Sequence, residues 1–240
     1  SWFGTDLRAS VCQIRPKVDQ PAKSTMPEWR VNGVLRADAP LVSSVAGKAA
    51  FGGTPTDASV VEAITELKAR GKTVTFYPFV MMDIPNGNAL PNPYSNNAAT
   101  NGQPVYPWRG RLTCSPAAGF TGTVDKTAAA ATQVATFFGT ATPAQFSVVG
   151  TEVSWTGSPT HWGYRRMILH YAYLCAAAGG VDAFLIGSEL RGLTTIRSNA
   201  STYPTVAALK TLAADVSAIL GPSCKVSYAA DWSEYFGHQP

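Results

Sequence analysis

Short apolar runs alternate with amphipathic stretches along the chain, and the apolar runs end at polar or acidic residues. Residues 183–187 are apolar throughout and are followed by polar positions, which is typical of a parallel strand buried on both faces. Residues 73–82 are rich in β-branched and aromatic side chains. Two further strong strand candidates end near Gly4 and Ala230. The pattern therefore predicts four strong strands separated by long connections.

Helical periodicity fills those connections. Residues 54–71 combine a capping Thr54, Pro55 at the first helical position and Asp57 in a capping-box-like pattern. Three further stretches have helical spacing: residues 125–139, 159–178 and 204–220. Strands that alternate with helices in this way form parallel βα units.

This order favours an α/β fold of the (β/α)8 TIM-barrel type. A doubly wound sheet would need a glycine-rich phosphate turn, and Gly52-Gly53 lacks the GxGxxG spacing. Because a closed barrel needs eight strands, the four predicted strands indicate an incomplete barrel. We expect residues 1–240 to be a segment of a single TIM-barrel-like domain in a larger polypeptide, with a long Pro-, Asn- and Gly-rich loop at about 84–122.

Composition narrows the functional classes. The chain has 240 residues, of which 45% are hydrophobic and 14% charged, as in a globular domain. The net charge of +4 is small and the basic residues are scattered, so we expect no nucleic-acid partner. No apolar run is long enough for a membrane span. The four cysteines and three histidines lack metal-ligand spacing, so no metal or cofactor is expected, while a disulfide between Cys12 and Cys114 stays open.

Carboxylates follow the predicted strands, where a barrel has its active face. The acidic candidates are Asp6, Asp83, Glu189, Asp231 and Glu234. Glycoside hydrolysis needs two carboxyl groups that flank the bond, about 5 Å apart for retention of configuration. Partial burial of Glu189 among Trp and Tyr would favour the protonated form that a general acid requires. The alternative is a structural ion pair between Glu189 and Arg191 or Arg8.

The other candidates have a structural alternative as well. Asp231 is a candidate general base of an inverting mechanism, or a cap of the following turn. Asp6 and Arg8 are expected to brace Glu189 or to hold substrate, and Asp83 is equally a turn-former. Aromatic and polar side chains near the strand ends can contact sugar rings or hydroxyls: Tyr94, Tyr106, Trp108, Arg191, Trp232, Glu234 and Tyr235.

Five strings carry a more specific resemblance: WFGTDLR, TVTFYPFVMMDIP, VYPWRGRLT, FLIGSELRGLT and SYAADWSEYFGHQP. Over essentially its whole length the chain resembles the TIM-barrel-like domain of the large tail-hub proteins of gene transfer agents and related phages of alphaproteobacteria. The resemblance implies a glycoside-hydrolase-like domain at the distal tail tip of a virion or phage-like particle. It also implies cell-envelope glycan, peptidoglycan or surface polysaccharide, as the substrate, and other tail or baseplate proteins as partners.

The resemblance implies roles for individual residues too. In the retaining glycosidase clan with this barrel, the acid/base carboxylate ends strand four and the nucleophile ends strand seven. Glu189 matches the acid/base position, and the nucleophile strand is expected beyond Pro240. The clan usually has Asn where this chain has Ser188. Two alternatives remain, a barrel that binds glycan without hydrolysis and a structural part of the tail hub.

Overall fold

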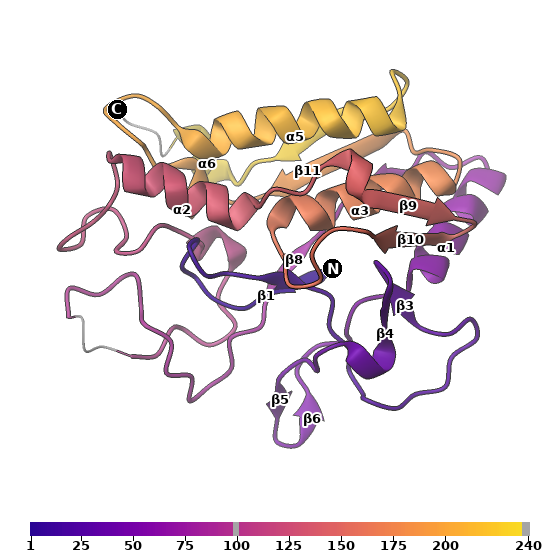
Figure 1. The fold of residues 1–240 in the computed structure, drawn as a ribbon, viewed down its shortest axis with the longest axis horizontal. Coiled ribbons are helices and arrows are strands. Elements are labelled where there is room, and N and C mark those ends of the chain that lie inside the picture. Colours follow the sequence, from indigo (N-terminus) through magenta and orange to yellow (C-terminus); the bar gives the residue numbers. More distant parts are fainter. Residues whose placement is uncertain (98–100, 237–240) are drawn as a thin grey trace.

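The computed structural model describes residues 1–97 and 101–236, which form a mixed α/β fold (Figure 1). Its central feature is a set of parallel strands. The bounds are β1 (Trp2–Gly4), β7 (Thr75–Phe76), β8 (Val80–Met82), β11 (Ala183–Ser188) and β12 (Lys225–Ala229). β1 is parallel to β8, and β11 lies between β7 and β12, parallel to both. β7 and β8 belong to one continuous stretch of chain, residues 75–82. Counted as one strand, this stretch has β1 on one side and β11 on the other, so neighbouring parallel strands follow chain order, as they do in a barrel. The described strands do not close.

One correction concerns the strand predicted at 73–82. It is divided into β7 and β8 by Tyr77, Pro78 and Phe79. Proline has no backbone N–H to donate to a neighbouring strand, which explains the interruption. As a result β7 pairs with β11 on one side, whereas β8 pairs with β1 on the other.

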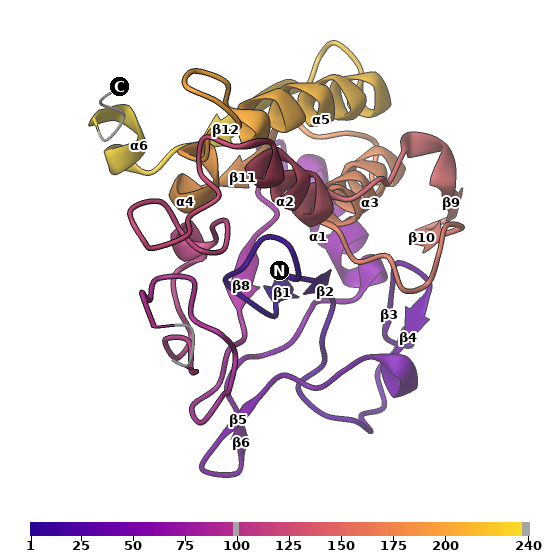
Figure 2. The ribbon, with the colours of Figure 1, turned by 60° about the vertical axis from the view of Figure 1, so that its left-hand side comes forward.

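The helices lie in the connections between these strands and after the last of them. They are α1 (Asp57–Ala69), α2 (Ala128–Phe138), α3 (Tyr164–Ala177), α4 (Arg191–Thr194), α5 (Pro204–Leu220) and α6 (Trp232–Phe236). α3 packs against both α1 and α5, as consecutive helices of a barrel do (Figure 2). The prediction of a helix over 204–220 is confirmed by α5, with proline at its first turn and Gly221 after its end.

The first helix begins later than predicted, at Asp57 with Thr56 as the N-cap. Thr54 instead connects the N-terminal strand to the following segment, because its hydroxyl donates to Ser1 O at 2.9 Å and accepts from Lys17 N at 3.1 Å. Asp57 is buried rather than an exposed capping residue, and its Oδ2 accepts from Asn32 N at 3.0 Å.

Several short antiparallel pairs are absent from the sequence prediction. They are β2 (Ile14–Arg15) against β1, β3 (Arg30–Val31) with β4 (Val34–Leu35), β5 (Ser44–Val45) with β6 (Lys48–Ala49), and β9 (Phe146–Val149) with β10 (Glu152–Trp155). The last hairpin occupies part of the interval before α3, which starts at Tyr164 and not near 159. Single-turn 3-10 helices are η1 (Arg36–Asp38), η2 (Arg109–Arg111) and η3 (Pro143–Gln145).

The core lies between the parallel strands and the helices. Trp2, Phe137, Tyr164 and Phe184 are fully buried there, and burial of each such side chain contributes about 1.5–3 kcal/mol. All four cysteines are buried free thiols, so Cys12 and Cys114 do not form a disulfide. Burial raises the pKa of the Cys12 thiol to about 12. Among the described residues, no helix has the length and apolar character needed to cross a membrane.

Candidate functional site at the strand ends

Glu189 follows β11 directly and has an unusual backbone conformation. Its φ of 51° lies in the left-handed region, which costs a residue with a Cβ about 1–2 kcal/mol. The pairing of β11 with β12 shifts register between Leu185 and Ser188, and Glu189 N donates to Ala229 O at 2.9 Å. Irregular strand ends and left-handed residues concentrate at functional sites. Among the acidic candidates in the part of the chain that the structure describes, only Glu189 has a positive φ.

The Glu189 carboxylate is held by two side chains from the loop after β8. Its Oε2 lies 2.7 Å from Arg109 Nη2 and accepts from Trp108 Nε1 at 2.8 Å. The Glu189 side chain is 35% exposed, whereas that of Arg109 is 7% exposed. In the part of the chain that the structure describes, Oε1 has no hydrogen bond. One carboxylate oxygen is thus fixed and the other is open.

The partner of Glu189 is neither Arg191 nor Arg8, as the ion-pair alternative supposed, but Arg109, which the sequence analysis did not select. Arg109 Nε donates to Ser188 O at 3.1 Å and to Ser188 Oγ at 3.0 Å. Its Nη2 also donates to Tyr77 Oη at 3.2 Å, and its guanidinium lies 3.8 Å from the Phe79 ring centroid. Arg109 is therefore anchored on β11 and on the link between β7 and β8. In the sequence, this role of Arg109 was indicated only by its position in the VYPWRGRLT string.

Two glycines allow this close packing. A Cβ on Gly192 would lie 2.3 Å from Leu112 O, so α4 approaches the chain just after η2 closely. A Cβ on Gly187 would lie 2.5 Å from Tyr164 Oη, which donates to Ile186 O at 2.9 Å. Gly192 thus lets α4 lie close to η2, next to Trp108 and Arg109, and Gly187 leaves room for the Tyr164 side chain.

A cavity of about 310 Å³ is connected to this site through Trp108, which lines it and donates to Glu189, whereas Glu189 and Arg109 are not among its lining residues. Its lining includes Tyr94, Trp108, Arg111 and Arg191. The Arg111 guanidinium lies 4.2 Å from the Tyr94 ring centroid, and Trp108 is 39% exposed. Exposed aromatic rings and charged groups of this kind can stack on a sugar and bind its hydroxyls.

The next strand end is connected to Glu189 through hydrogen bonds. Tyr228 Oη accepts from Leu190 N at 2.7 Å and donates to Glu234 Oε1 at 2.9 Å. Thr194 Oγ1 donates to the same Glu234 oxygen at 2.7 Å. Glu234 is therefore held by β12 and α4, in a position that supports the backbone next to Glu189.

Asp231 lies at the start of α6 and accepts hydrogen bonds from Ser233, whose N–H is 3.0 Å from Asp231 Oδ2. The Ser233 hydroxyl donates to the same oxygen. This hydroxyl, aided by the charge of Arg191, lowers the pKa of the exposed Asp231 carboxyl. Asp231 thus has the geometry of a helix cap and is held as a carboxylate. Trp232 and Tyr235 in α6 are strongly exposed.

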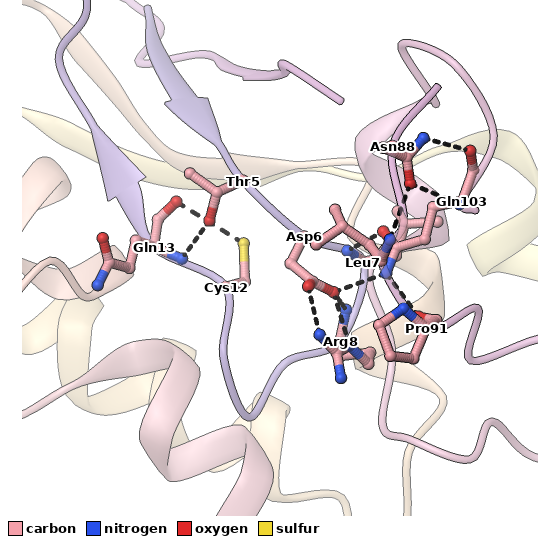
Figure 3. Close-up of polar contacts among 10 residues, drawn as sticks. Thr5, Asp6, Leu7, Arg8, Cys12, Gln13, Asn88, Pro91 and Gln103 are labelled. Atoms are coloured by element: carbon pink, nitrogen blue, oxygen red, sulfur yellow. Dashed lines mark hydrogen bonds and ion pairs between the residues drawn. The ribbon is translucent and has the colours of Figure 1, made fainter. Parts of the chain in front are cut away.

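Asp6 and Arg8 bind each other rather than Glu189 (Figure 3). Arg8 Nη2 lies 2.7 Å from Asp6 Oδ2, and Gln103 Nε2 donates to Asp6 Oδ1 at 2.8 Å. Gln103 Oε1 accepts from Leu7 N at 2.8 Å. The pair therefore fastens the long loop to the end of β1.

Asp83 and Tyr106 belong to another separate cluster. Asp83 Oδ2 lies 2.7 Å from Lys17 Nζ, and the Asp83 side chain is almost completely buried. Ser43 Oγ donates to Asp83 Oδ1 at 2.5 Å and lies 2.8 Å from Tyr106 Oη. These contacts connect the β5–β6 region to the end of β8, and the described contacts do not include Glu189.

One comparison with known proteins bears on this region. Residues 162–240 match the family model described as the GTA TIM-barrel-like domain. No curated protein matches the chain. The match includes α3, β11, α4, α5 and β12, so the resemblance expected from the sequence is confirmed over the segment that contains Glu189, Asp231 and Glu234. The strand order in the described part agrees with a TIM-barrel-like domain.

Proposed function

We propose that the chain is part of a glycoside-hydrolase-like domain that acts on cell-envelope glycan, with its site around Glu189. In this proposal the domain sits at the tail tip of a gene-transfer-agent-like particle and works during attachment to or penetration of the host cell. The main support is the carboxylate at the end of β11, which stands on a strained backbone beside an exposed tryptophan and a cavity. The family match over residues 162–240 includes this carboxylate.

Glu189 would act as the general acid/base. Arg109 and Trp108 hold Oε2, so the open Oε1 is the oxygen available to give a proton to the leaving glycosidic oxygen and to take one back from water. Retention would need a nucleophilic carboxylate about 5 Å away. Asp231, held as a carboxylate by Ser233, would suit the general base of an inverting reaction.

A second candidate function is glycan binding without hydrolysis. The observation that favours it is the Arg109–Glu189 ion pair at 2.7 Å. In this reading Glu189 is a structural anchor, because its Oε2 is already bound by both Arg109 and Trp108. In this case Trp108, Arg111 and Arg191 would still bind sugar.

Replacement of Glu189 by Gln in the full-length polypeptide separates the two functions. Hydrolysis by Glu189 predicts a loss of turnover of about a hundredfold or more on purified peptidoglycan or surface polysaccharide. Glycan affinity, measured by co-sedimentation, should change little because the amide keeps the shape and polarity of the side chain. Glu62→Gln, on the exposed face of α1, is the matched control.

Unchanged turnover in Glu189→Gln would exclude this residue as the acid. Absence of turnover in the unmodified polypeptide, together with glycan binding that Trp108→Ala weakens, would establish the binding function. If the unmodified polypeptide neither hydrolyses nor binds these glycans, both candidates fail.

A further inference from the structure

A second cavity, of about 310 Å³, lies between β2, the turn of the β3–β4 hairpin and the N-terminal end of α3. Its lining includes Arg15, Asn32, Asp38, Trp155, Trp162 and Arg166. It shares no lining residue with the cavity beside Glu189. Figure 2 shows β3 and β10 on one side of the molecule and α4 on the other. This cavity is therefore separate from the proposed glycan site.

Arg166 is a buried cation of this cavity without an anionic partner. Arg166 is only 2% exposed. Its guanidinium lies 3.6 Å from the Trp162 ring centroid and 4.7 Å from the Trp155 ring centroid. Nε donates to Asn32 Oδ1 at 2.6 Å and Nη1 to His161 O at 2.9 Å. Within residues 1–97 and 101–236, no carboxylate pairs with it and Nη2 makes no hydrogen bond.

Arg15 adds a second guanidinium to the same place. It lies 5.0 Å from the Trp162 ring centroid, and its Nε is buried without a hydrogen-bond partner among the described residues. Burial, together with the charge of Arg15, lowers the pKa of Arg166 to about 9. Two buried or half-buried cations carry a desolvation cost that no carboxylate in the described part of the chain offsets.

Arg166 is also held rigidly. The Asn32 amide that accepts from Arg166 has its Nδ2 at 3.1 Å from His170 Nδ1. His170 Nε2 in turn lies 2.9 Å from Asp57 Oδ1. This buried chain of side chains fixes the orientation of the guanidinium of Arg166, a residue that lines the cavity.

We propose that this cavity binds the oxyanion, carboxylate or phosphate, of a ligand of about monosaccharide size. Arginine binds both groups through its planar fork of N–H donors. A cavity of about 310 Å³ is at the small end of ligand sites. The exposed Asp38 at the same cavity can accept hydrogen bonds from hydroxyl groups. Uronic acids and sugar phosphates combine these two features.

Tryptophan fluorescence provides a direct test, because Trp155 and Trp162 line the cavity. The 240-residue chain would be titrated at constant ionic strength with sodium phosphate, sodium glucuronate and glucose. We expect a saturable change with at least one of the two oxyanions and none with glucose. The oxyanion that binds more tightly identifies the source of the group.

Arg15→Gln should weaken that binding about ten- to a hundredfold, because a charge-assisted hydrogen bond is lost. Arg70→Gln is the matched control, since it removes the same charge from an exposed helix end. Arg166→Lys keeps the positive charge but loses the planar set of guanidinium N–H donors, so it should also weaken binding. If circular dichroism shows that this buried variant does not fold, the Arg15→Gln variant, whose residue lies on the half-exposed β2, still tests the proposal. No saturable change with either oxyanion, or equal affinities in Arg15→Gln and Arg70→Gln, would overturn the proposal.

Discussion

Glu189 combines a cost in backbone conformation with a specific set of side-chain contacts. Its left-handed φ would suit glycine, yet the residue carries a carboxylate that Arg109 and Trp108 hold. A surface residue without a role would be expected to avoid this conformation. Backbone strain at a strand end therefore supports a functional carboxylate independently of the family match.

The strain is measurable with two substitutions that both remove the carboxylate. We expect Glu189→Gly to be more stable than Glu189→Ala by about 1 kcal/mol, because glycine adopts positive φ without the clash of a Cβ. Urea denaturation of the two variants gives the difference in free energy of unfolding. Equal stabilities, or a more stable alanine variant, would show that Glu189 is not strained in solution.

Residue roles were only partly predictable from the sequence. The position of Glu189 after an apolar strand was readable, since strand ends follow from local periodicity. The role of Arg109 was not, because a loop arginine can reach many partners, and which one it binds depends on how the 79 residues between Arg109 and Glu189 fold. Asp6 and Asp83 likewise follow strands, but each forms a separate ion pair, Asp6 with Arg8 and Asp83 with Lys17.

At the scale of elements, the site depends on how closely α4 approaches the turn η2. Gly192→Ala would place a Cβ 2.3 Å from the backbone oxygen of Leu112. Backbone cannot yield as a flexible side chain does, so we expect a loss of about 1–3 kcal/mol in the free energy of unfolding. Calorimetry or urea denaturation would measure it.

Gly52→Ala is the matched control for this change. A Cβ on Gly52 meets nothing within 4 Å, and its φ is not positive, so the variant should be neutral or slightly stabilising. If the two alanine variants lose the same stability, the close contact between α4 and the chain after η2 is not a feature of the folded protein.

The length of an element decided how well the sequence could predict it. Long elements with continuous periodicity, such as α5 and β11, were predicted within a residue or two. The short hairpins were missed because two-residue strands carry too little periodicity, although Asn32-Gly33 and Ala46-Gly47 have the positive φ values of tight turns. The prediction over 73–82 was wrong in its continuity because apolar composition outweighed the one proline within it.

For the molecule as a whole, the strands that precede the acidic candidates belong to two three-stranded sheets, β2-β1-β8 and β12-β11-β7. Parallel strands in chain order agree with the family match at residues 162–240. The second cavity lies elsewhere, where β2 and two hairpins pack around the start of α3. The additions to the barrel-like sheet thus create a surface that the sheet alone would not have.

These additions are joined to the core by the buried side chains of Asp57, His170, Asn32 and Arg166, which come from α1, α3 and the β3–β4 turn. Asp57→Ala should therefore cost about 3–5 kcal/mol, because it leaves the His170 ring and the Asn32 N–H buried without their acceptor. Glu66→Ala, which breaks an exposed ion pair with Arg70, should cost less than about 1 kcal/mol. Urea denaturation measures both changes. Similar small losses in the two variants would mean that water reaches the Asp57 network, and that the three elements are not held together through it.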